Sequence, residues 1–352
     1  MNLNLFDTYY LAGMAEEITP VTSFFRDRYF GDSDEFATDK VLVEYNDGDQ
    51  KMAPFVDPKA GDIPVARDGY KVLEFEPPMI APSRLLTLDD LRKRGFGEAL
   101  YQGSTQAERA NNLIARDMEF LDRRIARREE WMAAQVMINN AVTVQEYIDA
   151  DTQGESFTLY FYDSTRPNPA TYTGTTWTTF AIMKGDVVAM CDSLAEHGLP
   201  ASDLVLGSTT WAAVSQFSDL QQLLDNRRIE AGELQSSIVY PGVSRVGRLD
   251  FDGYTLDIYV PRERYTDDSG QKQSFFPATS AMVTAPGCGK TYYGAVTQIP
   301  HGSEEYETFT GQRIPKLVVD QNKDTRKLRL ASRPLPAPQN MAPWRYFANA
   351  VS

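Results

Sequence analysis

The longest amphipathic pattern lies in residues 104–140, a stretch without glycine or proline. Apolar residues recur there three or four positions apart, as one buried face of a helix requires. The stripe consists of Ala110, Ile114, Met118, Leu121, Ile125, Met132 and Val136. A helix of this length extends for about 50 Å. This is too long for an average small domain, so the helix must run along a larger body.

Two segments with alternating apolar and polar residues, 40–45 and 70–76, predict β-strands. The chain between them is punctuated by prolines and glycines. We therefore expect a long two-stranded flap with an irregular tip. Because an isolated hairpin is at best marginally stable in water, the flap needs a neighbour to lie on.

The remaining patterns mix helices and strands, which predicts an α+β fold. Residues 1–40 predict an extended arm with short helical pieces, and residues 85–96 predict a short helix or turn. Residues 177–197 predict a second helix, and strands dominate from residue 237 onward. No internal repeat is present, which argues against a solenoid or propeller.

Composition narrows the possible functions. The 352 residues suggest two or three domains. The net charge of -14 disfavours direct binding to DNA, whose affinity for proteins comes mainly from Lys and Arg. We expect no membrane segment, because no apolar stretch approaches the length of a membrane helix. The N-terminus does not resemble a signal peptide, which favours folding in a cytoplasm.

The residues that could carry chemistry are few. Cys191 and Cys288 lie far apart and are expected to be free thiols. His197 and His301 are the only histidines and do not have the spacing of metal ligands. No serine-nucleophile motif is present. We therefore expect no catalytic, cofactor-binding or metal-binding residue.

One motif imitates a phosphate-binding loop. Residues 286–291 read Pro-Gly-Cys-Gly-Lys-Thr and end like such a loop. The full motif needs a glycine where this chain has Thr284, and it must open a helix. The following residues, 292–296, instead have the pattern of a strand. A tight turn between two strands is therefore favoured over a nucleotide site.

Charged residues cluster on the long helix and in three adjacent acidic pairs. Arg123, Arg124, Arg127 and Arg128 alternate with acids at 119, 122, 129 and 130 on the long helix, which predicts a mixed charged face that forms ion pairs. A helix face lining an interior with DNA is the weaker alternative. The adjacent acids 89–90, 267–268 and 304–305 point apart in regular structure. We interpret them as solvated surface or contacts between subunits.

The order of these parts resembles the lambda-like major capsid protein E family of tailed phages, which has the HK97-type capsid fold. Residues 74–82, with the sequence Glu-Phe-Glu-Pro-Pro-Met-Ile-Ala-Pro, are similar to the family's junction between flap and body. Residues 105–140 resemble its spine helix. Residues 204–208 and 251–259 resemble segments of its axial domain. The resemblance covers nearly the whole chain.

The resemblance implies a fold with defined parts. These are an N-terminal arm (1–40), an extended loop or flap (41–76), a peripheral domain (77–175 and 316–352) with the spine helix at about 105–140, and an axial domain (176–315).

It also implies a function. The family forms hexamers and pentamers of an icosahedral shell that encloses double-stranded DNA without sequence-specific binding. The chain would be assembled in the host cytoplasm and become part of the virion. Scaffolding, portal and decoration proteins are candidate partners.

Three alternatives stay open at this point. An encapsulin-like cellular nanocompartment would share the fold and would contain a cargo enzyme. A nucleotide-hydrolysing enzyme would use the turn at residues 287–291. A phage accessory protein, such as a decoration or tail component, would have to accommodate the long helix and the large size of the chain.

Overall fold

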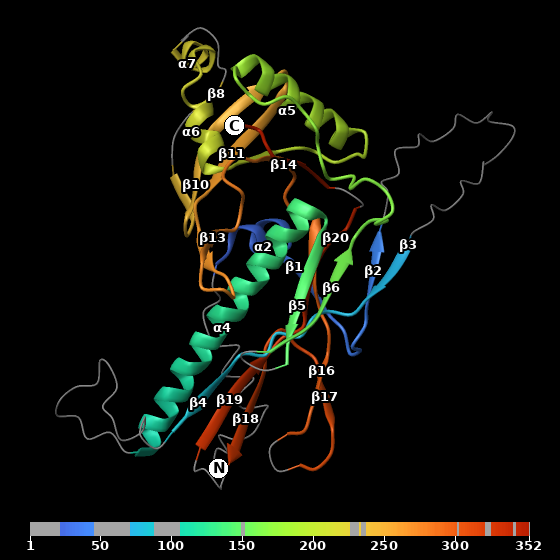
Figure 1. The fold of residues 1–352 in the computed structure, drawn as a ribbon, viewed down its shortest axis with the longest axis vertical. Coiled ribbons are helices and arrows are strands. Elements are labelled where there is room, and N and C mark those ends of the chain that lie inside the picture. Colours follow the sequence, from blue (N-terminus) through green and yellow to red (C-terminus); the bar gives the residue numbers. More distant parts are fainter. Residues whose placement is uncertain are drawn as a thin grey trace, which may run out of the picture.

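A computed structural model describes residues 22–45, 71–87, 106–148, 152–225, 232–233, 237–300, 303–320, 325–340 and 343–351. The molecule is elongated, and one long helix runs along much of its length (Figure 1). A seven-stranded sheet with three helices forms one end, and smaller sheets accompany the long helix toward the other end. The α+β class predicted from the sequence is confirmed.

The long helix α4 (Gln106–Asn139) confirms the predicted spine helix. Its apolar stripe is buried on two successive surfaces. Ile114, Met118, Leu121 and Ile125 pack against strands near the C-terminus. Met132 and Val136, farther along, belong to the largest core cluster. The helix ends where Asn140 adopts a φ of 50°, a left-handed conformation that asparagine tolerates better than most residues.

The seven-stranded sheet brings together strands from distant parts of the chain. Its order is β21 (Trp344–Phe347), β14 (Ala281–Thr284), β7 (Asp203–Leu206), β11 (Tyr254–Pro261), β10 (Val243–Phe251) and β8 (Gly232–Glu233), and β9 (Ser237–Tyr240) also pairs with β10. Helices α5 (Phe180–Ala195), α6 (Ser208–Val214) and α7 (Ser218–Asp225) accompany this sheet (Figure 1). The apolar side chains of α5 and of the sheet form a second core cluster.

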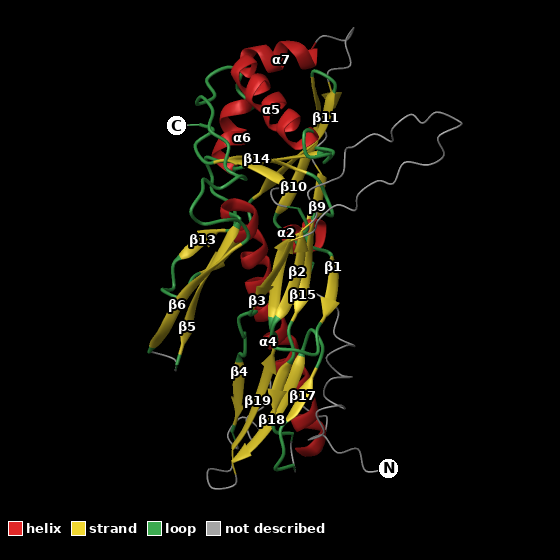
Figure 2. Cartoon of the chain, turned by 90° about the vertical axis from the view of Figure 1, so that its right-hand side faces the viewer, coloured by secondary structure: helices red, strands yellow, loops and turns green. Residues whose placement is uncertain are grey.

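The other strands form small sheets beside α4 (Figure 2). Two sheets have three strands: β1 (Asp32–Glu35), β15 (Gly289–Tyr293) and β20 (Pro334–Pro338) in one, and β18 (Ile314–Asp320), β19 (Thr325–Ala331) and β4 (Ser83–Leu86) in the other. Four pairs have two strands: β2 (Val41–Tyr45) with β3 (Lys71–Phe75), β5 (Ala141–Tyr147) with β6 (Gln153–Tyr160), β12 (Arg264–Thr266) with β13 (Lys272–Ser274), and β16 (Val296–Gln298) with β17 (Glu307–Phe309).

The short helix α2 (Phe24–Tyr29) lies in the predicted N-terminal arm, but its side chains are part of the core. The Phe24 ring contacts Tyr259 of β11, and the Phe25 ring lies 6.1 Å from the ring of Phe276. Residue Phe30, just after the helix, packs against Trp344 of β21. A six-residue helix is not stable by itself, so these aromatic contacts hold it in place.

Several sequence predictions can be compared with this architecture. The flap strands are present as β2 and β3, while residues 46–70 between them lie outside the described residues. The helix or turn predicted at 85–96 is wrong at its start, because residues 85–86 pair with β19 as part of strand β4. Residues 88–96 lie outside the described part of the chain.

The predicted division into peripheral and axial domains remains a prediction. Strand pairings cross it: β21 belongs to the segment predicted as peripheral, yet it pairs with β14 of the segment predicted as axial. Strand β15, also in the predicted axial segment, pairs with β1 of the arm and with β20. The chain therefore passes back and forth between the two ends of the molecule.

Candidate assembly site: buried ion pairs and exposed strands

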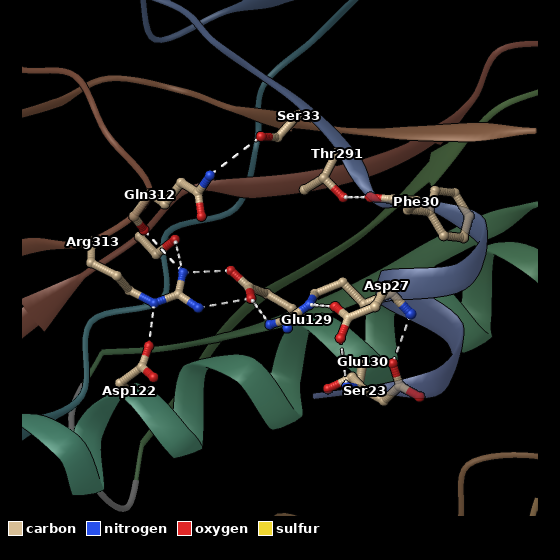
Figure 3. A network of polar contacts seen from close by, with 12 residues as sticks. Ser23, Asp27, Phe30, Ser33, Asp122, Glu129, Glu130, Thr291, Gln312 and Arg313 are labelled. Carbon is tan, nitrogen blue, oxygen red and sulfur yellow. Dashed lines mark hydrogen bonds and ion pairs between the residues drawn. The ribbon is translucent and has the colours of Figure 1, made fainter. Parts of the chain in front are cut away.

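Two consecutive buried glutamates, Glu129 and Glu130, lie in the C-terminal third of α4 (Figure 3). Glu129 is only 1% exposed and Glu130 only 2% exposed. A buried charge must be paired and hydrogen-bonded to be tolerated. The partners of these two glutamates therefore determine which segments α4 holds together.

Glu129 is held mainly by Arg313, which precedes β18. The two terminal nitrogens of Arg313 donate to both carboxylate oxygens, at 2.7 and 2.9 Å. Its Nε donates at 2.6 Å to Asp122, which lies about two helical turns earlier on α4. Burial opposes the charge on Arg313, but the two carboxylates outweigh this effect and raise its pKa. Arg313 thus joins α4 to strand β18, which begins at the next residue.

Helix α2 supplies further donors to the same glutamates. Arg26 of α2 donates to Glu129 at 3.0 Å, and the hydroxyl of Tyr293, which lies in β15 and not in α2, donates to it at 3.3 Å. The backbone N–H groups of Phe25 and Arg26 each donate to Glu130 at 2.8 Å. Burial raises the pKa of Glu130 to about 7, although these two hydrogen bonds act in the opposite direction. The start of α2 is therefore attached to the C-terminal third of α4.

A second buried ion pair connects α2 to the seven-stranded sheet. Arg28 donates to both carboxylate oxygens of Asp203 in β7, at 2.5 and 2.9 Å, and the Tyr29 hydroxyl donates to the same carboxylate at 3.0 Å. The arrangement is bidentate, which adds geometric specificity to the charge attraction. Through its two arginines, α2 bridges the long helix and the large sheet.

The carboxylate of Glu129 is saturated by partners from the same chain. Both oxygens of Glu129 already accept hydrogen bonds from protein donors, so neither is left for a substrate. The prediction of ion pairs on α4 is confirmed, and the structure adds that Glu129 and Glu130 are buried. One sequence signal could have revealed this: residue 129 fills the seven-residue gap in the apolar stripe between Ile125 and Met132.

The phosphate-loop imitation is a turn between strands β14 and β15, as predicted. Gly287 has a φ of 69° in this turn, a conformation that glycine adopts without strain. Lys290 lies within β15 and forms an ion pair with Asp34 of β1 at 2.5 Å. No helix follows the turn to receive a phosphate, because residues 289–293 are a strand.

The acidic pairs differ in their surroundings. Asp267 accepts hydrogen bonds from the backbone N–H groups of Ser269 and Gln271 and so closes the β12–β13 turn. Asp268 forms an ion pair with Arg128 of α4 at 2.9 Å. Glu304 and Glu305 are exposed, and residues 89–90 lie outside the described residues.

Exposed apolar side chains concentrate on strands with few neighbours. Leu42 and Leu73 lie on the flap strands, and Tyr147 and Tyr160 lie on the β5–β6 hairpin. Ile238, on the edge strand β9, is 81% exposed. Two-stranded sheets and free edges present unpaired backbone groups, so these elements are suited to contacts with other chains.

The sequence profile of the phage major capsid protein E family matches residues 7–346. The chain belongs to this family. Its function is that of the major capsid protein of a tailed phage. The resemblance inferred from the order of arm, flap, spine helix and axial segments is thereby confirmed.

Individual relatives agree with the family assignment. The capsid protein is 23% identical over 322 residues to a P21 prophage-derived major head protein of Escherichia coli O6:H1, covering 89% of this chain and 90% of the relative. It is 22% identical to the major capsid protein of Escherichia phage lambda, covering 84% of each chain. These relatives are phage proteins, which favours the phage function over a cellular compartment.

A solved structure supports the fold. The capsid protein matches a prophage protein of Escherichia coli CFT073, described as a capsid protein, with a TM-score of 0.66, 16% identity and coverage of 98% and 99% of the two chains. A phage-related protein of Bordetella bronchiseptica RB50 matches with a TM-score of 0.52 and 11% identity, covering 97% of each chain. The HK97-type capsid fold predicted from the sequence is confirmed.

Two further features concern binding. Within the described part of the capsid protein, no three His, Cys, Asp or Glu side chains converge as a group that could hold a metal ion. None of the described helices combines the length and apolar character needed to span a membrane. Both cysteines are buried and free among the described residues.

Proposed function

We propose that copies of this capsid protein assemble as hexamers and pentamers into a closed icosahedral shell that encloses the double-stranded DNA of a tailed phage. The observation that carries the proposal is the family match across residues 7–346. The exposed apolar residues on two-stranded sheets and edges support it, because such elements gain stability when a neighbouring copy covers them.

The charge of the chain fits a container for DNA. With a net charge of -14, the shell wall repels phosphate groups on average and leaves the genome free to move during packaging and ejection. The enclosed DNA is therefore contacted without recognition of its sequence. The family's role is structural, and the proposal includes no catalysis.

The parts of the chain have separate roles in the proposal. The flap (41–76) lies on a neighbouring subunit, and the axial domain (176–315) gathers around the centre of each hexamer or pentamer. The peripheral domain (77–175 and 316–352) provides contacts between these units. Assembly takes place in the host cytoplasm, with scaffolding, portal and decoration proteins as candidate partners.

Electron microscopy of the purified full chain tests the main proposal. Uniform closed shells are expected, and a persistent monomer under all assembly conditions would contradict it. A cargo enzyme that consistently copurifies with the shells, in place of a viral genome, would point instead to a cellular nanocompartment.

The flap needs its own experiment. Deleting residues 47–69 should leave a soluble, folded chain that forms no normal shells, because strands β2 and β3 remain while the connecting segment is lost. Circular dichroism verifies that the variant folds. The matched control replaces residues 47–69 with a glycine- and serine-rich segment of equal length. Normal shells from the deletion variant would refute the role of the flap.

A further inference from the structure

The sheet β4–β18–β19 has one face whose positively charged side chains form no ion pair with any described residue. On its inner face, Leu317 and Leu328 pack against Ile114, Met118 and Leu121 of α4. The strand register places Val318, Lys327 and Leu85 in one row on the opposite face, since paired residues in neighbouring strands point to the same side. Figure 2 shows this sheet beside α4, with β17 next to it.

This outer face is basic. Lys316 and Arg329 are cross-strand neighbours in the row next to Lys327. Like charges in such positions destabilise a sheet unless an anion lies between them. Burial, and for Lys316 also the charge of Arg329, lower the pKa of both groups. Among the described residues, no carboxylate forms an ion pair with Lys316, Lys327 or Arg329.

One donor nitrogen of the Arg329 guanidinium group has no hydrogen-bond acceptor among the described residues. Its Nη2 donates to the Gln298 side chain of β16 at 2.8 Å. Its Nε is buried and has no hydrogen-bond partner in the described structure. Asp320, at the far end of β18, lies on the same face but already has an interaction within the chain.

The same face also exposes apolar surface. Leu85 is 54% exposed and Val318 is 43% exposed, on either side of Lys327. The face therefore presents a cation between two apolar side chains, with further cations in the next row. A complementary partner would carry an apolar side chain flanked by carboxylates.

The chain itself contains such a segment, residues 303–307, which precede β17 and include its first residue, Glu307; we call this segment the acidic loop. Tyr306 is 76% exposed in this loop and lies between Glu305 and Glu307, with Glu304 next to them. All three glutamates are exposed and form no ion pair among the described residues. The backbone N–H of Glu305 donates to the Ser303 hydroxyl at 3.1 Å, which orders the start of the loop.

We propose that the acidic loop of one copy docks on the basic outer face of β4–β18–β19 of a second copy. Tyr306 covers Leu85 and Val318, and the glutamates pair with Lys327 and Lys316. The contact is heterologous, since two different surfaces meet. Repetition of a heterologous contact closes a ring when the rotation permits. The inference rests on the proposed shell function and specifies one contact within it.

Charge reversal tests the contact. Lys327→Glu and Glu305→Lys alter exposed residues, so both variants should fold like the wild type by circular dichroism and thermal unfolding. Each single change brings like charges together and should raise the protein concentration needed for half-maximal assembly by about tenfold or more. The double variant Lys327→Glu/Glu305→Lys restores opposite charges and should assemble close to the wild-type concentration. Light scattering measures the protein concentration for half-maximal assembly of the single and double variants, and electron microscopy shows whether they form shells.

Matched controls separate this contact from the effect of net charge. Lys272→Glu on β13 and Glu196→Lys at the end of α5 change exposed residues of the same types elsewhere, and they should leave assembly unchanged. If either single variant at the contact assembled like the wild type, or if both failed and the double variant did not recover, the contact would be excluded. If a charge reversal prevented folding, Lys327→Gln and Glu305→Gln would take its place, with a smaller shift expected for each and no recovery in the double variant. A wild-type chain that forms no shells would refute the proposed function itself.

Discussion

The buried ion pair between Arg313 and Glu129 allows a quantitative test of how the capsid protein is held together. The Arg313→Met substitution removes the guanidinium group and keeps an apolar stem of similar length. Glu129 then loses two hydrogen bonds of 2.7 and 2.9 Å, and Asp122 loses one of 2.6 Å. Both carboxylates remain largely buried.

The expected loss in the free energy of unfolding depends on the partners that these carboxylates keep. Breaking a buried ion pair by removing one partner typically destabilises a protein by about 3–5 kcal/mol, because a buried charge is left uncompensated. Glu129 keeps Arg26 at 3.0 Å and the Tyr293 hydroxyl at 3.3 Å. We therefore expect a loss of about 3 kcal/mol, at the lower end of that range.

Urea unfolding of the unassembled chain, followed by circular dichroism, measures this loss. The matched control is Arg123→Met on the same helix, whose partner Glu119 and whose own side chain are both about half exposed. An exposed pair of this kind contributes about 0–1 kcal/mol. The reasoning would be refuted if Arg313→Met lowered the free energy of unfolding no more than Arg123→Met does.

A double-mutant cycle separates the pair from its surroundings. Glu129→Met removes the carboxylate, so the double variant Arg313→Met/Glu129→Met no longer contains an uncompensated Glu129 charge. Its loss of stability should be clearly smaller than the sum of the two single losses, because residues in one ion-pair network are coupled. Additive losses would show that the two side chains act independently.

Three further predictions concern single positions. The pKa of Glu130 is raised from 4.5 to about 7, so the folded chain binds a proton at Glu130 more tightly than the unfolded chain does. This proton binding contributes fully to the free energy of unfolding below pH 4.5, and its contribution is lost as the pH rises toward about 7. Glu130→Gln should therefore flatten the pH dependence of the free energy of unfolding in that window, and an unchanged slope would contradict the raised pKa. Gly207→Ala should strongly destabilise the folded chain, because the added Cβ would lie 2.2 Å from the carbonyl oxygen of Ala278. Gly185→Ala in α5 is the matched control, since a Cβ there meets no atom within 4 Å. Thermal unfolding should show that this second variant is more stable by up to about 1 kcal/mol, because alanine favours a helix over glycine. Titration calorimetry with ATP and magnesium should detect no binding to the wild type or to Lys290→Ala, and saturable binding that is lost in the variant would restore the nucleotide site.

Much of the architecture is visible in the sequence because it depends on local periodicity. The spine helix follows from apolar residues three or four positions apart, and the structure places its ends at residues 106 and 139. The flap strands and the turn at residue 287 follow from alternation and from glycine. These features depend on neighbours within a few residues, which the sequence displays directly.

The candidate site depends on residues that are far apart in the chain, and the sequence does not display their proximity. Glu129 and Arg313 are separated by 184 positions, and no spacing rule relates them. The sequence predicted ion pairs on α4 but not their burial. Glu129 and Glu130 are buried because α2 and the residues before β18 cover that part of the helix.

The same limit applies to the outer face of β4–β18–β19. Lys327 and Leu85 are ordinary surface residues in the sequence, and residues 85–86 were expected in a helix or turn. Strand pairing alone places Leu85, Lys327 and Val318 in one row. The sequence by itself determined the helix, the two flap strands and the acidic composition, which depend on residue order and residue type. The tertiary structure decided which charges are buried together and which remain exposed, because both depend on segments that meet only in the folded chain.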